Sequence, residues 1–236
     1  MTTWSYNISK DMTTWSPSSE RRFAMPKETF FNLPKDKRNL IISAAMDEFS
    51  KAGYNTASIN QICKKSNIPK GSFYQYFTDK LDLYVYIMTL TIEEKIKFFS
   101  SAIAEFHTLT FLEQFRLLFL KGLEFAKKHP QYAALADQFS KEDNESVKSA
   151  VIKEGDKQAE SLFMQMIHNA KTKGEIDSKV DSLALCLLLQ SLNSAVNKYM
   201  IGKFGGISYE YNQEDINNFV DSLLDIIFSG IQNKAD

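Results

Sequence analysis

The chain has 236 residues, of which 44% are hydrophobic and 24% are charged, and its formal net charge is −1. This length accommodates a small module and a larger domain with its own core. The longest strongly apolar run, residues 183–189, is far shorter than the roughly 20 residues that a membrane span needs, and the N-terminus has no secretory pattern. We therefore expect a cytoplasmic protein with no membrane partner.

The charge is divided unevenly along the chain, with +4 over residues 35–80 and −6 over residues 81–236. A basic segment joined to an acidic remainder is typical of a nucleic-acid-binding module, although a few excess lysines are often only a solvated face. Cys63 and Cys186 each lie in an apolar helical pattern, far apart in sequence. We expect buried free thiols rather than a disulfide or a metal site.

Residues 1–34 are polar, contain three prolines and show no helical period, so we expect a flexible N-terminal extension. The pentapeptide MTTWS occurs at residues 1–5 and again at 12–16, and Met25 stands close to the start of the patterned sequence. This arrangement favours an extension upstream of the folded protein. The alternative is an arm that follows a DNA backbone, with Arg21, Arg22 and Lys27 as its cations.

The first predicted helix covers residues 35–52, because Pro34 marks its start and Ile42, Ala45 and Phe49 form an apolar stripe. Gly53 is expected to end it as a left-handed C-cap.

Two short helices follow within residues 58–77. Ser58 and Gln61 form a capping box that starts the first of them, and Pro69 starts the second. Phe73 and Phe77 lie one turn apart and are expected to anchor that second helix. The expected core of the three-helix module is Ile42, Phe49, Ile59, Ile62, Phe73 and Phe77.

Two short helices joined by a tight turn, the second with amide, hydroxyl and cationic side chains outside, favour a helix-turn-helix; an ordinary helical hairpin is the alternative. The segment GSFYQYFTDKLDLY, residues 71–84, follows Gly53-Tyr54 and the capped helix. It closely resembles the DNA-binding segment of TetR-family transcriptional regulators. The resemblance covers about residues 37–84.

This resemblance implies that one side of the second helix faces double-stranded DNA. The matching positions are Lys70, Gly71, Ser72, Tyr74, Gln75 and Tyr76, with Lys80 as the phosphate-binding lysine of the next helix and Ser58 as a further contact. Pro69 stands where many members of the family have serine, so one hydroxyl contact is missing.

Asp79 caps a fourth predicted helix over residues 79–105. Further helices are predicted at residues 111–128, 131–139, 144–173, 179–201 and 213–232. The expected fold is therefore all-α with about nine helices. Residues 35–80 are a helix-turn-helix DNA-binding domain, and residues 81–236 are a helical effector-binding and dimerisation domain.

Large aromatic and methionine side chains are concentrated between residues 98 and 166. Such a set is usually core, but it can also line an apolar ligand cavity, and TetR-family resemblance implies a small-molecule effector there. The candidates are Phe98, Phe99, Phe106, Phe111, Phe115, Phe119, Phe125, Phe139, Phe163, Met164 and Met166. The fourth helix runs from the DNA-binding module into this region and is a mechanical link between them.

The last two predicted helices are apolar on more than one face, so two different surfaces must pack against them to keep those faces out of water. A two-fold partner could cover the outer face, as in the dimers that the family resemblance implies; a wholly internal final hairpin is the alternative. The candidate dimer residues are Leu183, Leu187, Leu188, Leu192, Ala195, Tyr199, Phe219, Leu223 and Ile227.

An enzyme is not expected, because the chain has no glycine-rich phosphate loop, HExxH, CxxC or GxSxG pattern. The three histidines are scattered, and neither a cofactor nor a metal is predicted. A helical protein-interaction module without DNA binding remains the alternative. The sequence predicts a homodimeric regulator that binds a palindromic operator and responds to an apolar or amphipathic effector. The resemblance alone favours a repressor over an activator.

Overall fold

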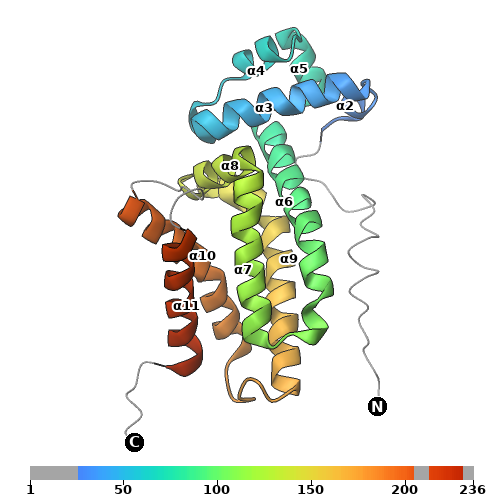
Figure 1. The fold of residues 1–236 in the computed structure, drawn as a ribbon. Coiled ribbons are helices and arrows are strands. Elements are labelled where there is room, and N and C mark those ends of the chain that lie inside the picture. The colour runs from blue at the N-terminus through green and yellow to red at the C-terminus, as the bar shows by residue number, and fades with distance from the viewer. Residues whose placement is uncertain (1–25, 205–212, 231–236) are drawn as a thin grey trace, which may run out of the picture.

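The computed structural model describes residues 26–204 and 213–230, and every regular element in this part of the chain is helical. The expected all-α fold is confirmed. The helices, labelled as in Figure 1, are α2 (Glu28–Phe31), α3 (Lys35–Thr56), α4 (Ile59–Lys65), α5 (Lys70–Tyr76), α6 (Lys80–Ala104), α7 (Phe111–Lys128), α8 (Pro130–Ser140), α9 (Glu145–Thr172), α10 (Ser182–Phe204) and α11 (Gln213–Ser229), with a short 3₁₀ turn, η1 (Phe106–Thr108).

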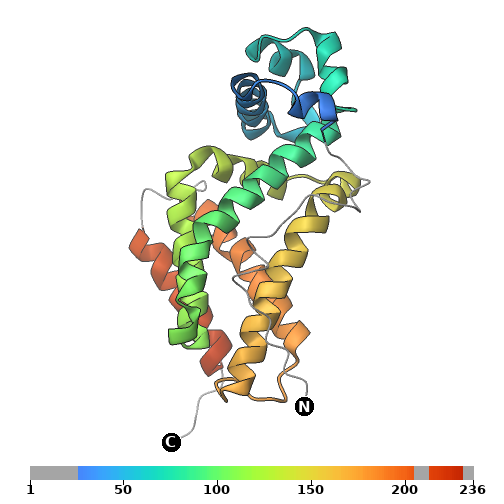
Figure 2. The same ribbon diagram turned by 90° about the vertical axis from the view of Figure 1, so that its right-hand side faces the viewer.

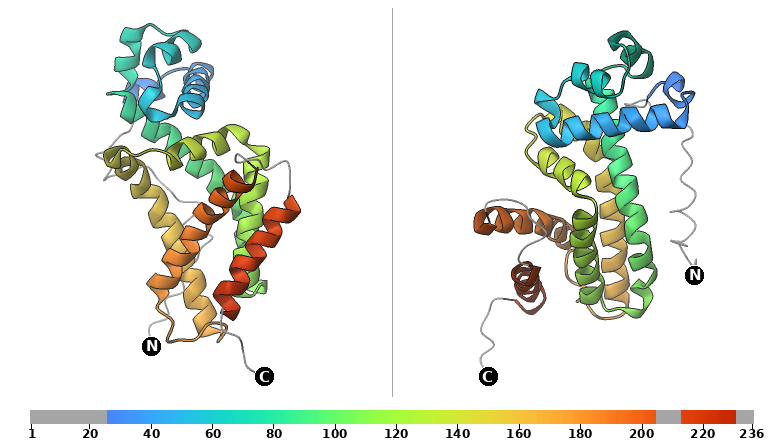
Figure 3. Two further views of the ribbon diagram at one scale, coloured as in Figure 1. Left: turned by 90° about the vertical axis from the view of Figure 1, so that its left-hand side faces the viewer. Right: turned by 45° about the horizontal axis from the view of Figure 1, so that its top comes forward.

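The helices form a small module at one end of an elongated body (Figure 1). Helix α3 lies across the top of α6, with α4 and α5 above it, and α8 packs beneath α3. Helices α6, α7 and α9 run lengthwise through the body, and the turned view in Figure 2 shows α6 descending from the module into it. Helices α10 and α11 cover one side of this group (Figure 3).

One hydrophobic cluster joins the small module to the top of the body. Phe49, Phe73, Phe77, Leu83 and Leu135 have no exposed surface, and together they bring α3, α5, α6 and α8 into one core. Two members of the expected α3 stripe, Ala45 and Phe49, are fully buried, and only Ile42 departs from the prediction. Ile41 is fully buried with Phe49, two turns later, while Ile42 is only half-buried.

A second hydrophobic cluster holds α7, α9, α10 and α11 together. Its fully or nearly fully buried members include Ile167 of α9, Cys186 and Met200 of α10, and Ile216 of α11. Cys63 is buried in the first cluster and Cys186 in the second, so the expected burial of both free thiols is confirmed. Burial raises the pKa of the Cys63 thiol.

The N-terminal part of the chain departs from the prediction. The flexible extension was expected to reach residue 34, but residues 26–34 are folded and include α2, whose Phe30 is fully buried in the first cluster. Residues 1–25, with Arg21 and Arg22 of the alternative DNA-binding arm, lie outside the described residues. Helix α2 was not predicted, because a helix of four residues is too short to show a helical period in the sequence.

Gly53 was expected to end the first helix, and the structure gives it a different role. Its φ of 66° and ψ of 179° interrupt α3, which resumes for a last turn to Thr56. A side chain here would meet α8, since an added Cβ would lie 3.0 Å from Oε1 of Gln138. The positive φ is what favours glycine at this position, because the end of the flexible Gln138 side chain can shift to admit a Cβ.

Within the described residues, no helix is long and apolar enough to cross a membrane. The same part of the chain contains no group of three or more His, Cys, Asp or Glu side chains arranged to hold a metal ion.

Candidate DNA-binding surface

The N-terminus of α4 is capped by one local and one distant side chain. Ser58 Oγ accepts from the Gln61 backbone N–H at 3.4 Å, as the capping box predicts. The Ser58 backbone N–H donates to Glu48 Oε1 at 3.1 Å, so α3 supplies the acceptor that Gln61 was expected to provide. The second carboxylate oxygen of Glu48 lies 3.1 Å from Lys65 Nζ at the other end of α4. Glu48 therefore binds both ends of this helix to α3.

The turn between α4 and α5 is a Schellman motif built around Asn67. Asn67 has a φ of 51°, a left-handed conformation that asparagine tolerates better than most residues. The Ile68 N–H donates to the Cys63 carbonyl at 3.0 Å, and the Asn67 N–H donates to that of Lys64 at 3.3 Å. Ile68 is buried with Cys63, which completes the hydrophobic contact of the motif. Pro69 was predicted to start the second helix and is the N-cap of α5, whereas the turn itself is formed by Asn67 before the buried Ile68.

Helix α5 presents a buried aromatic face and an exposed polar face. Phe73 and Phe77 are fully buried, with ring centroids 5.4 Å apart, which confirms their predicted anchoring role. Lys70, Gly71, Tyr74 and Gln75 are exposed and Ser72 is half-buried. The expected outward position of Tyr76 is wrong. Tyr76 is only 8% exposed, because it lies three residues after Phe73 and shares its inward face.

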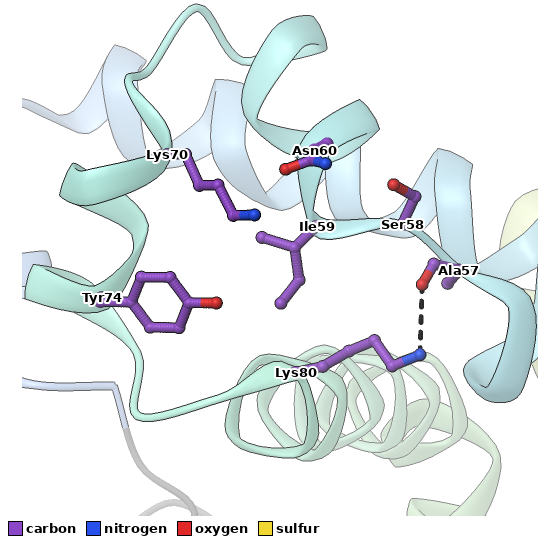
Figure 4. Close-up of a pocket in the computed structure, with 7 residues that line it drawn as sticks. All are labelled: Ala57, Ser58, Ile59, Asn60, Lys70, Tyr74 and Lys80. Atoms are coloured by element: carbon purple, nitrogen blue, oxygen red, sulfur yellow. Dashed lines mark hydrogen bonds between the residues drawn. The ribbon is translucent and has the colours of Figure 1, made fainter.

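An open cleft of about 230 Å³ lies between the start of α4, the exposed face of α5 and the start of α6. In Figure 4 the side chains of Lys70 and Tyr74 extend toward Ile59, whereas the side chain of Lys80 extends along the edge of the cleft to the Ala57 carbonyl. The lining residues are Ala57, Ser58, Ile59, Asn60, Lys70, Tyr74 and Lys80. Four of these were predicted DNA contacts. Asn60 was not, although an exposed asparagine in the first turn of such a helix is a suitable polar donor.

Lys80 is held at the edge of this cleft by the end of the α3 segment. Its Nζ donates to the Asn55 carbonyl at 3.1 Å and to the Ala57 carbonyl at 3.2 Å, and it lies 4.7 Å from the centre of the Tyr54 ring. Partial burial lowers the pKa of Lys80, with a smaller opposing effect from the charge of Glu142. An ammonium group has three donors, and these two carbonyls accept from two of them.

The predicted effector residues do not form one group. Phe111, Phe115 and Met166 are buried in the second cluster, and Phe99, Phe106, Phe119, Phe163 and Met164 pack against it. Phe98 and Phe125 form a ring cluster with His129 and Tyr132, in which Phe125 and Tyr132 stack at 5.8 Å, and Phe98 also lies 6.3 Å from the Phe99 ring. Phe139 of α8 packs against the first cluster.

The predicted dimer residues divide into an outer and an inner set. Leu183, Leu187 and Leu188 are 52%, 57% and 46% exposed on α10. Leu192 is buried in the second cluster, with Leu223 and Ile227 packed against the same cluster. Tyr199 and Phe219 stack at 4.0 Å within the protomer, and Ala195 is half-buried. Leu192 therefore belongs to the protomer core, and the outer leucines are the candidates for a partner.

The module geometry agrees with comparisons to known proteins. The family model described as bacterial regulatory proteins, tetR family, matches residues 41–87. The crystal structure of a TetR family transcriptional regulator from Chloroflexus aurantiacus superposes with a TM-score of 0.62 and 27% identity, covering 87% of this chain and 98% of that one. Residues 41–87 therefore match the DNA-binding region of TetR-family regulators, and the fold of the chain is similar to that of a TetR family regulator.

One curated relative and one further solved structure show how far the similarity extends. The HTH-type transcriptional regulator YhgD of Bacillus subtilis is 30% identical over 94 residues, which is 40% of this chain and about half, 48%, of that relative. FadR from Bacillus subtilis in complex with stearoyl-CoA has a TM-score of 0.65 at 18% identity, with 82% and 99% of the two chains covered. Both of these proteins are described as transcriptional regulators.

Gly71 offers a test of the candidate DNA-binding surface in which stability and binding move in opposite directions. A Cβ added at Gly71 meets nothing within 4 Å. Gly71→Ala should therefore raise the free energy of unfolding, by up to about 1 kcal/mol, because alanine favours a helix more than glycine does. The same Cβ should occupy space needed for close approach of DNA and weaken duplex binding. Chemical denaturation and fluorescence anisotropy measure the two effects, and unchanged duplex affinity would contradict the assignment of this face.

Proposed function

We propose that the chain is a homodimeric repressor whose two α5 helices read a palindromic operator and whose body binds an apolar or amphipathic effector. Residues 35–80 are the proposed DNA-binding domain, and residues 81–236 the proposed effector-binding and dimerisation domain. The observation that carries the proposal is that Lys70, Tyr74 and Lys80 all line one open cleft beside the exposed α5 face. Backbone-binding cations and a face for base edges are the two parts that duplex recognition requires.

Each exposed side chain of this surface suits a different part of the duplex. Gln75 can pair with the two major-groove groups of adenine, and Lys70 with the acceptors of guanine. Tyr74, Ser72 and Ser58 offer hydroxyl groups for phosphate or base contacts, and Gly71 permits close approach. Lys80 supplies its positive charge to a phosphate. The buried position of Tyr76 removes it from the base-reading set.

The proposed dimer uses the outer face of α10 and α11. Leu183, Leu187 and Leu188 of α10 are exposed, as are Ile226 and Phe228 of α11. Large apolar side chains on two adjacent helices are costly to leave in water, and a second copy packed across a two-fold axis would remove them from it. That axis would also relate the two α5 helices, which a palindromic operator requires.

Two contacts support coupling between an effector in the body and the DNA-binding surface. Helix α6 carries Lys80 at its first residue and packs Phe99 and Ile103 near its other end against the second cluster. Glu142, which follows α8 and is 6% exposed, accepts from Asn55 Nδ2 at 3.0 Å, next to a carbonyl that binds Lys80. A shift of α6 or α8 would therefore move the edge of the cleft.

Duplex binding is tested with Gln75→Ala and Lys80→Ala, on a duplex that the wild-type chain selects from a random-sequence pool. Gln75→Ala should lose about 1–3 kcal/mol of discrimination at one base position. Lys80→Ala should weaken selected and shuffled duplexes alike and reduce the slope of log affinity against log salt by about one. Lys51→Ala is the matched control, because Lys51 is an exposed lysine of α3 that lies outside the cleft. Unchanged binding by both cleft variants would refute the DNA-reading role of α5.

The dimer is tested by placing a charge on its proposed face. Leu187→Glu should shift the protein from dimer to monomer in sedimentation experiments, because an unpaired carboxylate at an apolar interface is strongly unfavourable. Leu40→Glu is the control, since Leu40 is a similarly exposed leucine, 45%, on α3 of the module. Leu192→Glu should instead disrupt the protomer core. A Leu187→Glu variant that remains dimeric would exclude this face.

Coupling between the effector site and the DNA-binding surface is tested by measuring ligand affinity with and without the duplex. The ligands tested are stearoyl-CoA, stearate and coenzyme A. Stearoyl-CoA is chosen because it is bound in the FadR structure to which this fold is similar. A ligand that releases the operator should bind about 5- to 150-fold more weakly when the selected duplex is present, because coupling between two sites is mutual. Calorimetric titrations with and without the duplex measure this ratio. Equal affinities would show that the ligand site does not control DNA binding.

A further inference from the structure

The C-terminal end of α5 is bonded to the segment that precedes α3. Lys27 Nζ donates to the Tyr74 carbonyl at 2.8 Å, and the Lys27 backbone N–H donates to the Tyr76 carbonyl at 2.8 Å. Thr29 Oγ1 donates to the Gln75 carbonyl between them. The last carbonyls of a helix have no partner within it. Here all of the last three, at residues 74–76, are satisfied by residues 27–29.

The donor segment is itself fixed to the core by one aromatic side chain. Phe30 has no exposed surface, and its ring lies 4.9 Å from that of Phe77, 6.3 Å from that of Tyr76 and 5.6 Å from that of Tyr86. Arg38 Nη1 also donates to the Phe31 carbonyl at 2.8 Å, which ties the end of α2 to α3. The segment can therefore hold α5 against two other helices.

We propose that residues 27–30 act as a clamp that positions the recognition helix on its operator. The proposal rests on the proposed role of α5 in reading DNA. A helix of seven residues has little stability of its own, and its aromatic anchors fix only the inner face. The clamp bonds the carbonyls of Tyr74 and Gln75, the same residues whose side chains are exposed toward the proposed duplex.

Positioning makes a different prediction from simple attraction to DNA. A residue that attracts phosphate changes the affinity for every duplex and the salt dependence of binding. A residue that only orients α5 changes the contacts of Tyr74 and Gln75 with base edges, and so acts on the selected duplex alone. Thr29 separates the two effects cleanly, because replacing it with valine keeps its shape and the net charge of the chain.

The main test is Thr29→Val in the full chain, with the duplex selected by the wild-type chain and a shuffled duplex of the same length. Loss of one net hydrogen bond should make the α5 amides exchange about two- to tenfold faster with deuterium and weaken binding of the selected duplex by a similar factor. Affinity for the shuffled duplex and the salt slope should not change. Thr29→Ser, which retains the hydroxyl, should restore both wild-type values.

A second variant tests the anchor of the clamp. Phe30→Ala should release the whole segment, accelerate α5 exchange more than Thr29→Val does and lower selected-duplex affinity further. Asn32→Ala is the matched control, since Asn32 is an exposed neutral residue next to α2. It should leave exchange and binding unchanged.

Two results would overturn the clamp. One is wild-type affinity for the selected duplex in both Thr29→Val and Phe30→Ala. The other is an equal loss on selected and shuffled duplexes, which would mean a general effect on folding or charge. Failure of the proposed function is distinguishable, because Gln75→Ala would then keep wild-type binding, whereas failure of the clamp alone leaves the Gln75→Ala defect intact.

Discussion

A helix of seven residues does not hold its conformation alone in water, and the proposed DNA-reading surface is built from two such helices. Their geometry depends on burial of aromatic side chains from α5. Phe73 and Phe77 are fully buried, and Phe30 closes over Phe77 from the N-terminal segment. Because the inner face of α5 is packed in the core, its opposite face is exposed and carries polar and charged side chains.

Burial alone would leave the backbone groups at the ends of these short helices without partners, at a cost comparable to lost hydrogen bonds. The molecule satisfies many of them from other elements. Glu48 of α3 accepts from the Ser58 N–H, and Lys80 of α6 donates to carbonyls where α3 ends. Lys27 and Thr29 donate to the end of α5. The module is thus a set of short helices whose termini are fixed by their neighbours.

Helix α6 connects this module to the rest of the molecule because it belongs to two cores. Leu83, Tyr84 and Ile87 are buried in the first cluster, whereas Phe99 and Ile103 pack against the second. Close-packed cores transmit displacement rather than absorb it. A rigid helix shared by both clusters is therefore a physical basis for the proposed effector response, and the Glu142 to Asn55 contact joins the two parts independently.

Local pattern in the sequence determined the all-helical fold, most helix bounds to within a few residues, the Ser58 cap and the Phe73 and Phe77 anchors. These features depend on interactions between side chains three or four positions apart, so they can be predicted from the sequence alone. Helix α2 could not be predicted, because its four residues are stabilised by a core some 45 positions away in the chain, through bonds such as that from Thr29 to Gln75. The same limit applies to the inward Tyr76, the carbonyl partners of Lys80 and the division of the α10 leucines between core and surface. Each is decided by which distant surface a side chain meets, and only tertiary packing sets that.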